Sequence, residues 1–396
     1  MTQDLSSRRM FVRLGLVCTA SLMLSATPVY AESTPGVTDK EILLGGVLTL
    51  TGPGRLVTEP IEHGMRSYFR MVNDRGGIHG RKIVWRVEDD AYQPARALAA
   101  AKKLVERDRV FLLVGVLGVP LTNAVSPYAE QAKVPLIAAS ASPQPPKRYT
   151  FGLMANYADV IYQVTNYVAK KGGAKRIGYI YQNDDLGAAG RVGLEKAIKE
   201  NGLKLVANVG FERGTRDFST HVLRLKAAKA DVVISMSIAP STATAMKQAT
   251  AIGYSPKWAT FSVGNLNFMS KLLGKNIEGL IVGSELESQY ADSPAMREHR
   301  ALLSKYYPGS KPDWGSLIGY AEARLTVGAL RAAGRNLTRD AFVGVLEKTK
   351  SWNIGIMAPV SFSRTRRTGP SGVKVYHWKD GKPVALSDWL PIGVAK

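Results

Sequence analysis

Short apolar runs rich in β-branched residues alternate with amphipathic segments from residue 41 onward, and this alternation constrains the fold more than any other feature. The runs are apolar along their length, which is typical of strands buried on both faces. Between them, apolar residues recur at helical spacing, as at Ile61, Met65, Phe69 and Val72. Strands joined through helices form parallel sheets covered by helices on both faces. The runs lie at 42–50, 82–88, 110–114, 134–138, 176–181, 203–211, 231–236 and 257–261.

The runs form two series, which predict an α/β protein with two doubly wound Rossmann-like lobes. The first series ends near 151–156, after a loop rich in Ser and Pro. After Ile281, helical patterns dominate, at 294–306, 315–333 and 338–349. This region has too few strands for its own sheet, so we expect it to complete the first lobe through a three-crossover hinge. The predicted division is 36–153 plus 285–355 for lobe 1, and 154–284 plus 356–396 for lobe 2.

The N-terminal residues 1–31 have the pattern of a signal peptide. Arg8, Arg9 and Arg13 precede an apolar run, and Val29-Tyr30-Ala31 fits a small-x-small cleavage site. We therefore expect cleavage after Ala31. The alternative is a membrane anchor, but an apolar run of about thirteen residues is shorter than the roughly 20 that span a bilayer. The arginine pair also resembles a twin-arginine signal, although such pairs occur in ordinary export signals, so the export route stays open.

Cysteine usage and charge exclude several functions. The single cysteine, Cys18, lies inside the predicted leader, so the mature chain should contain no disulfide or reactive thiol. The preceding Val17 does not suit a lipoprotein site. The net charge of +21 stays strongly positive without the leader, but the cations are scattered among acids without a basic helix or an RNA-binding signature. The sequence therefore predicts no nucleic-acid partner.

An enzyme or a metal site would need convergent residues that the sequence does not show. Asp89 and Asp90 end a strand, where successive side chains point to opposite faces, so we expect a polar strand end that caps the next helix or ligates nothing. The five histidines have no metal-ligand spacing, and no G-x-S-x-G motif is present. The sequence predicts neither an enzyme nor a cofactor or metal.

A series of short sequence motifs, in a fixed order, gives the chain a resemblance to a known family. The chain resembles the type I periplasmic solute-binding proteins of the leucine/isoleucine/valine-binding kind, the substrate-binding components of ABC importers. The resemblance covers about 36–390. The motifs are GGVLTLTGP at 45–53, GGIHGR at 76–81, DD at 89–90, LVG at 113–115, KVPLI at 133–137, NDDLG at 183–187 and DFS at 217–219.

The resemblance implies a periplasmic, monomeric protein that captures a small-molecule ligand by closing its two lobes and then docks on an inner-membrane ABC permease. A sensor of the same fold, which docks on a receptor, is an alternative. In this family, one lobe binds a ligand carboxylate with hydroxyls and amides. The corresponding loop here contains Ser140, Ala141 and Ser142, and the preceding loop, with Val119 and Thr122, is more apolar than in the family.

The other side of the predicted cleft has lost the family's groups for an ammonium. Leu186, and Ile238 or Ala239, stand where pocket tyrosines are expected, and Ser262 stands where the ammonium-binding acid is expected. An amino acid would then bury an unpaired charge, so we expect an apolar or aromatic carboxylate.

Two further residues bear on the ligand. Arg55 follows the turn 51–54 at the first strand end and could pair with a carboxylate, or it could be a solvated loop residue. Glu285 follows a strand near a predicted crossover and could supply an acid to an ammonium. A branched-chain or other amino-acid ligand therefore stays open.

The leader pattern predicts that the mature protein begins at Glu32 and is soluble. Intact mass measurement of protein from the envelope fraction tests this expectation. A chain that keeps residues 1–31, or that sediments with membranes, would contradict it.

Overall fold

The computed structural model of the chain describes residues 34–52, 54–140 and 145–393. The predicted leader, Ala141 and Ser142 lie outside the described residues. Five parallel strands form the first sheet, in the order β2-β1-β3-β4-β5. These strands are β1 (Glu41–Leu48), β2 (Lys82–Asp89), β3 (Leu112–Leu117), β4 (Leu136–Ala139) and β5 (Thr150–Gly152). The helices that follow the first three strands are α1 (Arg55–Asp74), α2 (Pro94–Lys102) and α3 (Val119–Gln131).

The second sheet follows the order β12-β11-β10-β9-β8-β6-β7, with β13 paired to β11. Its strands from β6 to β10 run parallel, whereas β11 to β13 pair in antiparallel fashion. The strands are β6 (Arg176–Gln182), β7 (Lys204–Phe211), β8 (Val232–Met236), β9 (Lys257–Phe261), β10 (Ile281–Ser284), β11 (Gly372–Lys379), β12 (Lys382–Ala385) and β13 (Leu390–Pro391). The helices of this part are α4 (Tyr157–Lys170), α5 (Asp185–Asn201), α6 (Ser219–Ala227), α7 (Ala239–Ala251) and α8 (Asn267–Leu273).

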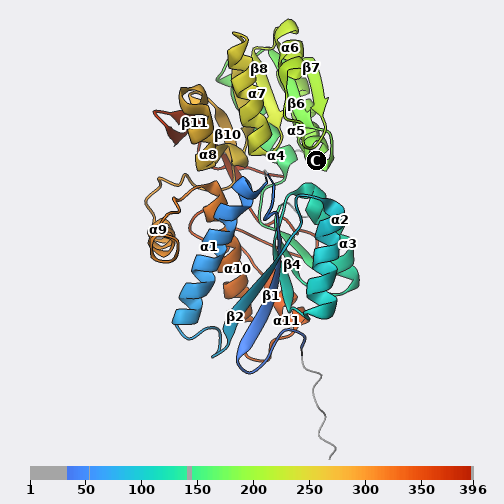
Figure 1. Cartoon of the computed structure of the whole chain (residues 1–396), viewed down its shortest axis with the longest axis vertical. Coiled ribbons are helices and arrows are strands. Elements are labelled where there is room, and N and C mark those ends of the chain that lie inside the picture. The colour runs from blue at the N-terminus through green and yellow to red at the C-terminus, as the bar shows by residue number, and fades with distance from the viewer. Residues whose placement is uncertain (1–33, 53, 141–144, 394–396) are drawn as a thin grey trace, which may run out of the picture. The chain divides into compact units, whose positions relative to one another are not determined.

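Three late helices return to the first sheet. They are α9 (Pro294–Tyr306), α10 (Trp314–Ala332) and α11 (Arg339–Glu347). Helix α10 packs on α1 and β4 although it follows β10 in sequence. The chain then goes back to the second sheet at β11, so it passes between the sheets three times. We call the first sheet with α1–α3 and α9–α11 lobe 1, and the second sheet with α4–α8 lobe 2 (Figure 1). The predicted two-lobed α/β fold is confirmed, and the exact lobe boundaries remain a prediction.

Most elements begin where the sequence gives a local reason. Helix α10 begins after Asp313, whose carboxylate accepts a hydrogen bond from the Ser316 backbone N–H at 3.0 Å in a capping box. Strand β8 is apolar except at Ser235 and is buried at every position. Helix α4 was not predicted from the sequence. Asn156 caps it, and Val160, Val164 and Val168 face the core.

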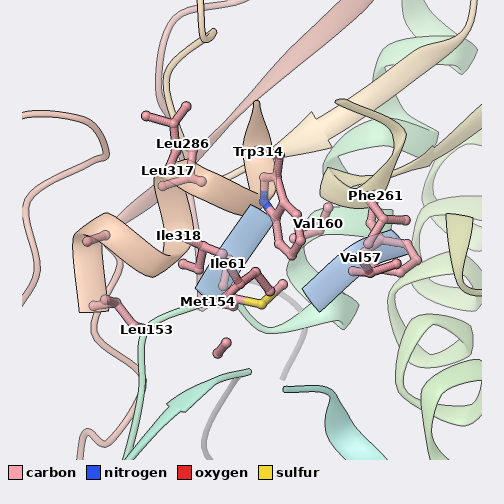
Figure 2. Close-up of a cluster of buried hydrophobic side chains, with 14 of the residues drawn as sticks. Val57, Ile61, Leu153, Met154, Val160, Phe261, Leu286, Trp314, Leu317 and Ile318 are labelled. Carbon is pink, nitrogen blue, oxygen red and sulfur yellow. The ribbon is translucent and has the colours of Figure 1, made fainter. Parts of the chain in front are cut away.

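An apolar cluster joins the two lobes where the chain passes between them. It combines side chains from α1, the segment after β5, α4, β9, the segment after β10, and α10 (Figure 2). Its labelled members are buried: Val57, Ile61, Leu153, Met154, Val160, Phe261, Leu286, Trp314, Leu317 and Ile318. Close approach of α1 and α10 depends on glycine, because a Cβ on Gly64 or Gly319 would overlap the backbone of the other helix.

One buried acid in α10 has no compensating group among the residues that the structure describes. Glu322 is fully buried, and neither carboxylate oxygen has a hydrogen-bond partner among the described residues. Burial raises the pKa of Glu322 well above its usual value of 4.5. Stability linked to this group is therefore full below about pH 4.5 and is lost as the pH rises toward the folded-state pKa.

We expect Glu322→Gln to be more stable than the wild-type protein at pH 8 but not at pH 4.5. The difference in unfolding free energy should grow with pH to about 1–3 kcal/mol, because ionisation of the glutamate favours the unfolded chain and glutamine does not ionise. Urea unfolding across this pH range measures it. Glu195→Gln, at an exposed ion pair with Arg191, is the control and should show no such trend. A pH-independent difference for Glu322→Gln would contradict the account.

Candidate functional site

A pocket of about 480 Å³ lies where loops from both lobes meet, beyond the carboxyl ends of parallel strands. This is where ligands bind to open α/β sheets. Lobe 1 contributes the loops after β1 and β2, and lobe 2 contributes the loops after β7 and β8. The lining residues are Thr51, Gly52, Gly54, Ala91, Tyr92, Gln93, Arg213, Gly214, Thr215, Arg216, Ile238, Pro240, Ser241 and Thr244. We call this the interlobe pocket.

Asp89 and Asp90 hold together the two loops that form the lobe 1 wall of the interlobe pocket. The Asp89 carboxylate accepts hydrogen bonds from the Leu50 N–H at 2.9 Å, the Thr51 hydroxyl at 2.7 Å and the Ala91 N–H at 2.9 Å. The Asp90 carboxylate accepts from the Thr49 hydroxyl at 2.6 Å. The two acids thus tie the loops after β1 and β2 together. Helix α2, which follows them, begins without a side-chain cap. Of the two roles that the sequence left open for these acids, capping the next helix is therefore wrong.

The lobe 2 wall carries two arginines. Arg213 forms an ion pair with Asp184 at 2.6 Å, and Asp184 also caps α5 by accepting the Leu186 N–H at 2.9 Å. Arg216 is exposed and forms no ion pair with another described residue. This wall therefore offers positive charge to a ligand.

Tyr92 connects the two walls. Its carbonyl accepts a hydrogen bond from Arg213 Nη1 at 3.1 Å, and the Arg213 guanidinium lies 5.0 Å from the centre of its ring. Its hydroxyl accepts from Gln182 Nε2 at 3.3 Å. Desolvation raises the pKa of Tyr92 to about 12, so the phenol stays neutral at physiological pH. Tyr92 and Arg213 were not predicted from the sequence, although Tyr92 closely follows Asp89 and Asp90 at the end of β2.

The predicted lobe 2 residues lie at the starts of helices near the interlobe pocket. Ile238 lines the pocket. Ala239 begins α7, and Leu186 lies in the first turn of α5; both are buried. No aromatic ring stands at these positions, so this part of lobe 2 is aliphatic.

The predicted lobe 1 residues are more dispersed. Ser140 is buried at the end of β4, and Val119 begins α3. Thr122 is buried, and its hydroxyl has no described hydrogen-bond partner. The Arg55 guanidinium donates to the Leu50 carbonyl at 3.1 Å and pairs with Glu59 at 3.2 Å. Arg55 is not among the lining residues of the interlobe pocket, which instead contains Arg213 and Arg216.

Glu285 lies next to Ser262 and contacts it directly. The Ser262 hydroxyl donates to Glu285 Oε2 at 2.8 Å, and Trp314 Nε1 donates to Oε1 at 3.0 Å. Ser262 belongs to lobe 2 and Trp314 to lobe 1, so the carboxyl group links both lobes. All three residues are buried, and burial raises the pKa of Glu285. The strand end after β10 therefore brings an acid to the place where the resemblance puts the family's acid.

The described part of the chain contains no group of three or more side chains placed to hold a metal ion, and no helix there is long and apolar enough to cross a membrane.

The model of the family described as periplasmic binding protein matches residues 41–383. The chain belongs to this family. The predicted resemblance to leucine/isoleucine/valine-binding proteins is confirmed, and so is the prediction of a solute-binding protein and not an enzyme, because members of the family bind solutes.

Relatives of known sequence match over nearly their whole length. An amino acid binding protein of Pseudomonas aeruginosa is 24% identical over 367 residues, which cover 91% of this chain and 95% of the relative. The Leu/Ile/Val-binding protein BraC3 of Rhizobium johnstonii is 26% identical over 386 residues, covering 91% and 98%.

Solved structures show the same fold. A fatty acid ABC transporter substrate-binding protein from Thermomonospora curvata matches with a TM-score of 0.83 at 23% identity, covering 92% of this chain and 96% of that chain. A branched chain amino acid ABC transporter from Thermus thermophilus with bound valine matches with a TM-score of 0.82 at 19% identity, covering 91% and 98%. At these identities the likeness concerns the fold, and both kinds of ligand occur on it.

Proposed function

We propose that this protein is the periplasmic substrate-binding component of an ABC importer and captures an apolar or aromatic carboxylate between its lobes. The observation that carries the proposal is the interlobe pocket, whose walls come from both lobes and whose lobe 2 wall contains Arg213 and Arg216. Its volume of about 480 Å³ falls within the range of small-molecule sites. After closure, the protein docks as a monomer on an inner-membrane permease.

The charge and the lining of the site favour an acid without an amino group. The arginines attract an anion, and Ile238 and Pro240 in the pocket lining offer aliphatic surface. We propose that the carboxylate contacts the loop at 140–142 and that Arg216 takes the part expected of Arg55, because Arg216 lines the interlobe pocket and Arg55 does not. The structurally similar protein from Thermomonospora curvata is named as a fatty acid ABC transporter substrate-binding protein, and a fatty acid is an apolar carboxylate.

An amino-acid ligand is a second candidate, because Glu285 is present beside Ser262. A carboxylate at this position could pair with a ligand ammonium. However, both Glu285 oxygens already accept hydrogen bonds. Burial also raises the pKa of Glu285, because desolvation disfavours its charged form. A ligand ammonium would therefore share the Glu285 carboxyl group with Ser262 and Trp314 and would gain less compensation for its desolvation.

Titration calorimetry with 3-phenylpropanoate and phenylalanine separates the two candidates, since the ligands differ only in the amino group. We expect the acid to bind at least about tenfold more tightly, about 1.4 kcal/mol, because the amino acid must desolvate an ammonium without a strong partner. Arg216→Met should weaken the binding of 3-phenylpropanoate, and Arg55→Ala should leave its affinity nearly unchanged.

The same titrations with Glu285→Gln give the decisive control. If phenylalanine or leucine binds most tightly and Glu285→Gln abolishes that binding, the amino-acid function replaces the proposed one.

A further inference from the structure

Two consecutive residues in the wall of the interlobe pocket have an unusual backbone. Ala91 and Tyr92 have φ values of 47° and 58°, in the left-handed region that residues with a Cβ seldom adopt. Neither position is glycine. Such conformations persist only where the surroundings over-determine them, and they cluster at functional sites. The turn therefore calls for a reason beyond connecting β2 to α2.

The two aspartates hold this turn in place. The Ala91 N–H donates to Asp89 at 2.9 Å, and the Tyr92 N–H donates to Asp90 at 2.7 Å. Asp90 is itself fixed by the Thr49 hydroxyl at 2.6 Å. The ends of β1 and β2 thus fix the direction in which residue 92 leaves lobe 1.

Tyr92 then meets a fixed group on lobe 2. Arg213 contacts both its carbonyl and its ring, and Gln182 contacts its hydroxyl. Arg213 is held in turn by Asp184, the cap of α5. A second link reaches the same helix start, where Asn123 of α3 donates to Asp185 at 2.9 Å. All these contacts between the lobes are made by residues of the chain itself, so they form without a ligand.

We propose that Tyr92 is a positioning residue for ligand capture: its left-handed turn carries it across the cleft, where it holds Arg213 and lobe 2 in the binding arrangement. This inference rests on the proposed function, in which the two lobes close on a ligand. Because the contacts need no ligand atom, they populate the closed form in advance. Apparent affinity scales with the competent fraction, so the Tyr92–Arg213 contact sets part of the dissociation constant.

Distances between two spin labels on opposite lobes test the proposal without added ligand. The only cysteine, Cys18, lies in the predicted leader. Arg107→Cys, in the exposed segment after α2 of lobe 1, and Lys199→Cys, on the exposed side of α5 in lobe 2, therefore give two labelling sites in the mature protein. Arg213→Met removes both contacts to Tyr92, and Tyr92→Phe retains the carbonyl and the ring. Arg216→Met is the matched control, since it removes a cation from the same pocket wall but no contact to Tyr92.

We expect Arg213→Met to give a longer and broader distance distribution than the doubly labelled protein without this substitution. It should also weaken the binding of 3-phenylpropanoate by at least about threefold. Tyr92→Phe and Arg216→Met should keep the parent distance, although Arg216→Met weakens the acid. If Arg213→Met is poorly folded by its melting temperature, Tyr92→Leu takes its place and should also lengthen the distance.

An unchanged distance in Arg213→Met would overturn the proposal even if its affinity falls, because Arg213 would then be only a ligand contact. If no carboxylate binds to any variant while Arg213→Met still lengthens the distance, the role of Tyr92 stands and the proposed ligand class fails.

Discussion

The close packing of α10 against α1 is the constraint on which the two-lobed arrangement depends. Gly64 and Gly319 allow the helices to approach until the backbone of each occupies the space that a Cβ on the other would need. This contact returns the late part of the chain to the first sheet after β10, and the apolar cluster of Figure 2 forms beside it. Three chain passages between the lobes follow from this return, and they limit the relative motion of the lobes to a hinge.

The parallel direction of the strands determines where the ligand-binding loops lie. The carboxyl ends of β1 and β2 in lobe 1, and of β7 and β8 in lobe 2, send their following loops to the interlobe pocket. The acids at the end of β2 rigidify one wall, and the cap of α5 orients Arg213 on the other. The aliphatic start of α7 and the positive wall are together suited to an anion with an apolar body. Function therefore depends on loops, whereas the sheets and helices hold them in register.

The sequence was sufficient for the fold because hydrophobic periodicity reports directly on buried strands and helices. Strand β9 was predicted with its exact bounds, 257–261, and α9 with its exact bounds, 294–306. The site was harder to predict. The reach of Arg213 to Tyr92 depends on loops more than 100 residues apart, and a left-handed turn at two non-glycine residues leaves no compositional signal. Glu285 was recognised as an acid, but its contact with Ser262 and Trp314 follows only from the tertiary arrangement.

Closure of the lobes around the ligand is the central claim. Small-angle X-ray scattering of the mature protein with and without saturating 3-phenylpropanoate tests it most directly. The account predicts a smaller radius of gyration in the presence of the acid, because ligand contacts to both lobes favour the closed form. An unchanged radius at a concentration where calorimetry shows full occupancy would contradict capture by hinge closure.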